Sequence, residues 1–291
     1  MTDPCTVVVI VLNWCGEEDT ARCLESLLEV ATPGLEILLV DNGSSGGSGE
    51  RLRERFPSVD FLQTGANLGY AGGNNRGIER ALQRSPDFVL VINNDTEVDP
   101  SFVDEMLKVA RSDDRVGAVA PLVTYSEDRV WYGGGRFVAW KGLGVHDGVD
   151  TSAGVAQELG SRPVSFLNGC CLLLRVEALQ RVGFFDESFF VYVEDVDLSI
   201  RMTRAGYSLV FAPEARIVHH TISPDAPGTP VQIRLRDINR RRLMAKHFGG
   251  VARMPFVLWF YSTRALLLVR YGLAMDRGRV RAIWHGMVTP L

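Results

Sequence analysis

The first half of the chain alternates short apolar runs with helical patterns, and this alternation constrains the fold more than any other feature. Apolar runs rich in branched residues occupy residues 6–12, 35–40, 59–63 and 87–93, and helical patterns lie between them at 19–30, 49–56 and 71–84. Alternating strands and helices predict a parallel sheet covered by helices. Asp99-Pro100 predicts the start of a further helix, as N-cap and first helical residue. We therefore expect an α/β fold with a doubly wound, mostly parallel sheet.

The second half predicts further strands and helices and then a helical appendage. Residues 166–183 read as a strand feeding a helix, and residues 194–211 as a helix followed by a strand. Between the halves, residues 125–162 are rich in glycine and lack periodicity, which predicts either a long irregular binding loop or an unstructured insert. We expect one catalytic domain over residues 1–230, with halves at about 1–122 and 123–230, and a tail over 231–291.

The tail differs from the rest of the chain in charge. Residues 231–291 carry twelve Lys and Arg against two acidic residues, whereas residues 1–230 carry nineteen against thirty-three. A basic, apolar tail on an acidic body favours an enzyme docked on anionic lipid over a nucleic-acid binder. The apolar segment 254–272 is interrupted by polar residues and is short for a membrane span, so an in-plane amphipathic anchor is expected. The alternative is a helical pair that packs on the body or on a second subunit, as in a homodimer.

Cysteine usage and the N-terminus predict a cytoplasmic protein, peripheral at the inner face of the cell membrane if the tail binds lipid. The five cysteines form no CxxC pair, which suits neither a disulfide framework nor a zinc site. The N-terminal apolar run is not preceded by basic residues, and no cleavage signal follows it, so no signal peptide is expected.

Polar residues follow three of the predicted strands, where an open parallel sheet binds its ligands. These are Asn13, the segment 41–44 and the segment 93–97. Asp41 alone is equally well explained as a helix N-cap. Asn93, Asp95 and Glu97 place oxygen atoms at alternating positions, which favours Mg²⁺ or Mn²⁺ bridging a diphosphate, with a plain turn as the alternative.

Six segments together resemble the family 2 glycosyltransferases with the GT-A fold, and most of all their rhamnosyltransferase-like branch. The resemblance covers about residues 5–250, and the segments stand in the family's order. They are VVIVLNW, LLVDNGS, NLGYAGGNNRGI, VINNDTEVDP, FLNGCCLLLRVEAL and GFFDESFFVYVEDVDLSIRMTRAGY. The glycine-rich third segment is not the dinucleotide motif GxGxxG, and no such motif follows the first strand.

The resemblance implies a donor site, a metal site and an acceptor site. Asp41 would bind the nucleoside and Asp95 the metal, which His219, or His220 beside it, would help to coordinate. Because position 93 is Asn, the DxD-type motif is incomplete, and the metal would be held more weakly. A packing or capping role is the alternative for either histidine, and His146 is a weaker candidate. The other implied binding residues are Asn13, Asn67, Asn74 and Asn94 for the donor and Gly169 and Asp197 for the acceptor. Trp131 in the glycine-rich segment is a further acceptor candidate, since its ring could stack on a sugar, with core packing as the alternative.

The acidic cluster at residues 194–197 has two interpretations. On its own it is an ordinary acidic first turn of a helix. On the resemblance, Asp195 is the catalytic base that deprotonates the acceptor hydroxyl, and Glu194 and Asp197 position the acceptor or the helix. A single base on the face opposite the leaving group implies inversion at the anomeric carbon.

The predicted function is therefore the transfer of a sugar from a nucleotide-diphosphate donor to an acceptor hydroxyl. We expect dTDP-rhamnose first and UDP-sugars second as donor. The acceptor would be a lipid-linked saccharide, a soluble glycan or a natural-product aglycone. The alternatives are a catalytically inactive sugar-binding module of the same fold, a nucleotidyltransferase, which would need a basic motif that the segment 13–20 lacks, and a nicotinamide dehydrogenase.

Overall fold

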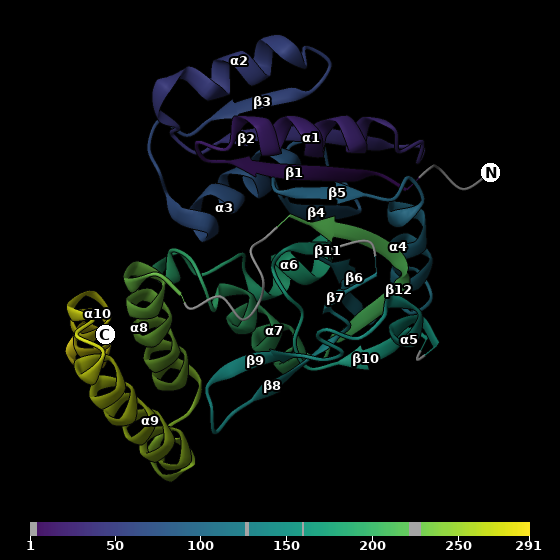
Figure 1. Ribbon diagram of the computed structural model, residues 1–291. Coiled ribbons are helices and arrows are strands. Elements are labelled where there is room, and N and C mark those ends of the chain that lie inside the picture. The colour runs from purple at the N-terminus through teal and green to yellow at the C-terminus, as the bar shows by residue number, and fades with distance from the viewer. Residues whose placement is uncertain (1–4, 126–127, 159, 221–227) are drawn as a thin grey trace.

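The computed structural model describes residues 5–125, 128–158, 160–220 and 228–291 (Figure 1). The first four residues, which form part of the N-terminus judged to lack a signal peptide, lie outside the described residues. The elements of the first half are β1 (Val7–Asn13), α1 (Glu17–Leu28), β2 (Leu35–Asp41), α2 (Ser48–Arg55), β3 (Asp60–Gln63), α3 (Gly69–Leu82), β4 (Phe88–Asn93), β5 (Thr96–Val98) and α4 (Phe102–Ala110). The predicted alternation of strands and helices is confirmed.

Strands β1 to β4 form the parallel part of the sheet. Strand β1 pairs with β2 on one side and β4 on the other, and β3 continues beyond β2, all in parallel. Residues 7–11 of β1 are at most 2% exposed because helices cover both faces. Burial on both faces explains why this strand reads as a continuous apolar run and not as an alternating one.

The second half of the chain completes a mixed sheet of ten strands, and its strands β8 and β9 form a separate two-stranded sheet. The elements of the second half are β6 (Val116–Thr124), β7 (Val130–Tyr132), β8 (Gly135–Val138), β9 (Leu143–His146), α5 (Ala153–Glu158), β10 (Arg162–Val164), β11 (Cys171–Arg175), α6 (Val176–Val182), α7 (Glu194–Arg204) and β12 (Ser208–His219). Strand β11 lies between β4 and β6 and is antiparallel to both, whereas β12 is parallel to β6.

Two local predictions were wrong. Residues 125–162 are not irregular, because their described part forms β7, the β8–β9 hairpin and α5; the glycines there lie in turns and close contacts and hide the strand pattern. Helix α4 begins at Phe102 with Ser101 as its N-cap, two residues after the predicted start. Asp99 instead accepts hydrogen bonds from the backbone N–H and the hydroxyl of Ser101, so it stabilises the turn before the helix.

The tail folds into α8 (Pro230–His247), α9 (Met254–Leu273) and α10 (Arg277–Val288), of which α10 was not predicted. Figure 1 shows these three helices as a lobe beside the sheet. Helix α8 joins the lobe to the body, since Leu243 belongs to the main hydrophobic core. No helix within the described residues is long and apolar enough to cross a membrane.

Candidate active site

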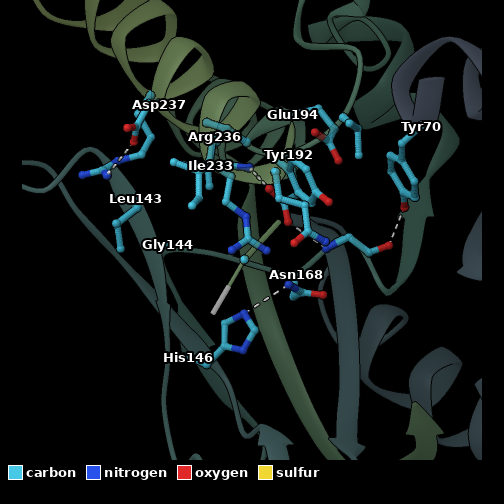
Figure 2. A pocket seen from close by; sticks show the side chains of 18 of the residues that line it. Tyr70, Leu143, Gly144, His146, Asn168, Tyr192, Glu194, Ile233, Arg236 and Asp237 are labelled. Atoms are coloured by element: carbon cyan, nitrogen blue, oxygen red, sulfur yellow. Dashed lines mark hydrogen bonds and ion pairs between the residues drawn. The ribbon is translucent and has the colours of Figure 1, made fainter. Parts of the chain in front are cut away.

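A cavity of about 760 Å³ lies between the sheet and the tail helices (Figure 2). On the sheet side it is lined by the end of β4, the turn after it and the end of β12. On the opposite side it is lined by α8, α9 and Ile283 of α10. Six of the predicted site residues meet there, namely Asp95, Trp131, Gly169, Glu194, Asp195 and His219.

Asp95 and His219 are brought together by strand pairing. Strand β5 pairs antiparallel with β12, so that Thr96 lies opposite His219. Asp95 Oδ1 is 3.0 Å from His219 Nε2, and the side chain of His219 is 7% exposed. Burial would raise the pKa of Asp95, but the contact with His219 outweighs it and holds that pKa below its ordinary value. Asp95 is therefore ionised at neutral pH.

This pair fits a divalent cation that is shared with a ligand. Neither ring nitrogen of His219 makes a well-aligned hydrogen bond within the described residues, although both are buried. A carboxylate and an imidazole are ligands that Mn²⁺ accepts. The described residues contain no group of three or more His, Cys, Asp or Glu that could hold an ion alone. Any cation here would need further oxygen ligands, such as those of a diphosphate.

His220 does not share this position. Its Nε2 lies 2.7 Å from Glu97 Oε1. The choice of His219 over His220 therefore agrees with the geometry at Asp95.

Asp195 and Glu194 begin α7 at the cavity. Asp195 accepts hydrogen bonds from the backbone N–H groups of Gly169 at 3.0 Å and Val196 at 2.8 Å. Burial raises the pKa of Asp195 to about 6 despite these hydrogen bonds. Burial and the adjacent charge of Asp195 raise the pKa of Glu194 further above its ordinary range. Burial thus favours the protonated form of Glu194, and Asp195 is the carboxylate that can accept a proton.

The predicted nucleoside-binding residues Asn13, Asp41 and Asn94 do not line the cavity but form a hydrogen-bonded network around the buried Asn13 and Asp41. Asn13 donates a hydrogen bond from Nδ2 to Asp41 Oδ1 at 2.6 Å and accepts one from the Thr20 hydroxyl at 2.9 Å. Asn94 donates to the same hydroxyl at 2.8 Å. Gln63 donates to the other Asp41 oxygen at 2.6 Å. The structure therefore links three of the predicted donor residues through Thr20.

Asn67 lies two residues before the first residue of α3, and Asn74 lies within that helix. Asn67 Oδ1 accepts a hydrogen bond from the backbone N–H of Gly69 at 2.8 Å, which holds the glycine-rich turn. Asn74 is 1% exposed, and its Oδ1 has no hydrogen-bond partner among the described residues. Neither side chain lines the cavity.

Asp197 does not face the cavity. Its side chain is 0% exposed and lies 2.7 Å from Arg201 Nε, from Lys246 Nζ and from His247 Nε2. Two of these partners belong to α8, so the carboxylate joins α7 to the tail. Sequence spacing could not reveal this role, because the two α8 partners, Lys246 and His247, lie 49 and 50 residues further along the chain.

Two further residues that shape the site were missed. Asn239 of α8 is buried and donates hydrogen bonds to the carbonyl groups of Phe189, Val191 and Tyr192, at 2.6–2.9 Å. It thereby holds the loop before Glu194, where Phe190, Tyr192 and Val193 all have positive φ. Tyr70 donates from its hydroxyl to the carbonyl oxygen of Gly169. In a single sequence no signal separates Asn239 from the surrounding basic residues.

Trp131 and His146 line the cavity on the side of the β8–β9 hairpin. The Trp131 ring makes edge contacts with His219 and His146, at centroid distances of 4.8 and 4.7 Å. Burial lowers the pKa of His146 to about 4, so its ring is neutral. Its Nδ1 donates to the Trp131 carbonyl oxygen, and its Nε2 therefore accepts from the Asn168 amide (Figure 2). This contact helps to fix the backbone that supports Asp195.

Comparisons with known proteins identify the family to which the chain belongs. The family model described as "Glycosyl transferase family 2" matches residues 6–183. An N-acetylglucosaminyl-diphospho-decaprenol L-rhamnosyltransferase of Mycobacterium tuberculosis is 31% identical over 98% of this chain and 99% of its own length.

Two solved structures share the fold. A mannosyltransferase from Pyrobaculum calidifontis, in complex with GDP-Man and Mn²⁺, aligns over 99% of this chain and 87% of its own, with a TM-score of 0.62 and 16% identity. GalNAc-T7 with UDP, GalNAc and Mn²⁺ aligns over 88% of this chain and 54% of its own, with a TM-score of 0.61 and 14% identity. The fold is thus GT-A, and this chain is a glycosyltransferase that belongs to family 2 and resembles its rhamnosyltransferases.

Proposed function

We propose that the protein transfers a sugar, first of all rhamnose from dTDP-rhamnose, to a hydroxyl group of a lipid-linked saccharide, with inversion at the anomeric carbon. One observation carries the proposal: a single cavity holds the Asp95 and His219 pair at one edge and the Asp195 carboxylate, with its raised pKa, at another. The similarity to a mycobacterial rhamnosyltransferase supports the donor and acceptor classes.

Asp195 is the proposed base. The acceptor hydroxyl loses its proton as its oxygen attacks the anomeric carbon, and a carboxylate with a pKa near the working pH is suited to accept that proton. The N–H groups of Gly169 and Val196 hold both carboxylate oxygens in place. Burial and the charge of Asp195 raise the pKa of Glu194, and in its protonated form Glu194 can donate a hydrogen bond to a sugar oxygen.

Asp95 and His219 are the proposed ligands of a divalent cation, Mn²⁺ or Mg²⁺. When bound, the cation would offset the negative charge that develops on the departing nucleotide diphosphate. Asp41, with Asn13 and Asn94 beside it, would bind the nucleoside, and its buried network gives a rigid acceptor for hydroxyl or N–H groups. The solved relatives with Mn²⁺ and a nucleotide support these assignments.

The tail is the proposed site of membrane contact. Helix α9 buries only Phe256 and Phe260 fully, and it leaves Leu258, Leu266 and Val269 more than 60% exposed. An unpartnered apolar helix face beside a strong excess of positive charge suits the surface of an anionic bilayer. Cytoplasmic localisation at the inner membrane face follows from that proposal.

Flotation with liposomes tests the membrane contact. The wild type should float with vesicles of phosphatidylglycerol and not with phosphatidylcholine alone, and Leu266→Glu should weaken flotation. Elution of the vesicle-free protein as a dimer that Leu266→Glu dissociates would instead assign the face to a homodimer and refute the lipid proposal.

A thermal-shift panel followed by a transfer assay tests the enzymatic proposal. Ligands that bind only the folded state raise its melting temperature by mass action. We expect a metal-dependent shift with dTDP and dTDP-rhamnose that exceeds the shifts with UDP and GDP, and transfer from the donor that shifts most. A shift with UDP alone would reassign the donor, and binding without transfer to any acceptor would favour the inactive sugar-binding module.

A further inference from the structure

The cavity is acidic at its sheet side and basic at its tail side. Asp95 and Asp195 line the sheet side, and three arginines line the tail side: Arg236 and Arg240 from α8 and Arg264 from α9. The only acidic side chain among the cavity residues of the tail is Asp237. Three guanidinium groups against one carboxylate leave a net positive charge there, and the proposed chemistry at Asp195 does not use it.

Arg236 makes the fewest polar contacts of these three arginines. Its guanidinium carbon lies 4.7 Å from the ring centroid of Tyr192, three residues before Asp195. It makes no ion pair or side-chain hydrogen bond within the part of the chain that the structure describes, and Figure 2 shows it among the residues around the cavity. The stacked ring orients the guanidinium and leaves its N–H groups available to a ligand.

Arg240 and Arg264 share the single carboxylate of Asp237. Arg264 binds it through Nε at 3.0 and 2.9 Å, whereas Arg240 Nη1 is 3.7 Å from it. Burial and the neighbouring Arg264 lower the pKa of Arg240 to about 9. Arg240 is 5% exposed, and its buried Nε–H has no acceptor among the described residues. Arg240 also donates to the carbonyl oxygen of Lys141, so its Nε–H is the donor that a ligand in the cavity would satisfy, and leaving a buried donor unpaired costs free energy.

Apolar side chains line the same side of the cavity as the arginines. Ile233, Leu267 and Ile283 line it from the three tail helices. Leu266, next to Leu267, is 70% exposed on the outer surface of α9. Carboxylates on the sheet side therefore face arginines and apolar side chains on the tail side, which matches a ligand with a sugar, an anionic group and a hydrocarbon chain.

We infer that Arg236, with Arg240 behind it, forms a subsite for the diphosphate of the acceptor, between the sugar at Asp195 and a hydrocarbon chain that leaves along α9. The inference rests on the proposed function and names the chemistry by which its acceptor is recognised. The same chemistry could serve the donor diphosphate, so the experiment separates the two sources. Arg236 is a binding residue in this scheme and takes no part in proton transfer.

The kinetic test compares two acceptors, a short-chain N-acetylglucosaminyl-diphospho-lipid and an octyl N-acetylglucosaminide, which lacks phosphate. Arg236→Ala should raise KM for the diphosphate acceptor about tenfold, as expected for the loss of a charge-assisted hydrogen bond. It should leave KM for the octyl glycoside and for the donor unchanged. Arg234→Ala, on the same helix but outside the cavity, is the matched control and should change none of them. A rise in donor KM alone would assign the arginine to the donor and overturn the inference.

A binding test separates this inference from the proposed function. Geranyl diphosphate, in EDTA to prevent metal-dependent nucleotide-site binding, should raise the melting temperature of the wild type and of Arg234→Ala but not of Arg236→Ala, and geraniol should raise none. If this pattern is found without any sugar transfer, the subsite stands and the proposed function fails. If transfer occurs but Arg236→Ala binds geranyl diphosphate like the wild type, the subsite is refuted and the function stands.

Discussion

Asp195 and Asp197 lie two residues apart on α7, and replacing each carboxylate by its amide should change stability in opposite directions. Burial raises the pKa of Asp195 from 3.8 to about 6, so its ionised form is disfavoured in the folded state. The difference corresponds to about 3 kcal/mol of unfavourable free energy at a pH above 6, and this cost vanishes below about pH 4. Asn would lose one good acceptor for a backbone N–H, at about 1 kcal/mol. Asp195→Asn should therefore stabilise the fold by about 2 kcal/mol at pH 8.

The ionised carboxylate of Asp197 has the opposite effect and stabilises the folded state. Although burial disfavours its charge, contacts with His247, Arg201 and Lys246 hold its pKa at about 2. Ionised Asp197 thus contributes about 2 kcal/mol of stability above pH 4, which is lost as the pH falls through 2. Asp197→Asn should cost at least that much at pH 8, because it also leaves buried cations without a counter-charge.

Urea denaturation of both variants at pH 8 and pH 5 measures these effects, with transfer activity recorded in parallel. Asp195→Asn should unfold at higher urea than the wild type at pH 8, with most of the gain gone at pH 5, and its transfer rate should fall 10²-fold or more while donor binding remains. Asp197→Asn should unfold at lower urea at both values. Equal midpoints for Asp195→Asn and the wild type at pH 8 would refute the desolvation argument, and retained transfer would remove Asp195 as the base.

Three further expectations follow from the site. The wild-type kcat/KM should fall about tenfold per pH unit below about 6, because protonated Asp195 cannot accept the acceptor's proton; a pH-independent rate down to pH 5 would contradict this. Asp95→Ala should abolish the Mn²⁺-dependent part of the nucleotide thermal shift. If calorimetry showed that Asp95→Ala binds Mn²⁺ like the wild type, Asp95 would not be a metal ligand. Gly69→Ala should lower the urea midpoint well beyond Gly65→Ala: both glycines have positive φ, but only at Gly69 would a Cβ meet a neighbour, 2.4 Å from the Phe190 carbonyl oxygen.

The parallel half of the fold was predictable because its central strands, β1 and β4, are buried on both faces. Residues 7–12 and 88–92 are apolar throughout, and such runs between amphipathic helical patterns have few other interpretations. The segment 125–162 was not predictable, since its short strands are separated by glycines and carry no alternating pattern. Their pairing depends on partners far along the chain, such as β6 for β7.

The candidate site likewise contains residues that the sequence could predict and contacts that it could not. Asp95 and His219 are more than a hundred residues apart, and only the family resemblance joined them in the sequence; the pairing of β5 with β12 supplies the physical cause. For Asp197 the resemblance left open whether it positions the acceptor or the helix, and only the structure shows contacts with the helix and the tail, because residues two apart on a helix face different directions. Asp195 faces the cavity, and Asp197 faces α8.

Tail and body act as one structural unit at the active site. Asn239 of α8 holds the carbonyl groups of the loop that precedes Glu194, and Lys246 and His247 of the same helix pair with Asp197. The helix that presents the proposed base is therefore anchored by the segment that presents the proposed acceptor and membrane contacts. A change in how the tail is seated, on lipid or on an acceptor, would be transmitted to Asp195 through these hydrogen bonds and ion pairs. Removal of residues 231–291 should for this reason abolish transfer and not merely release the protein from membranes.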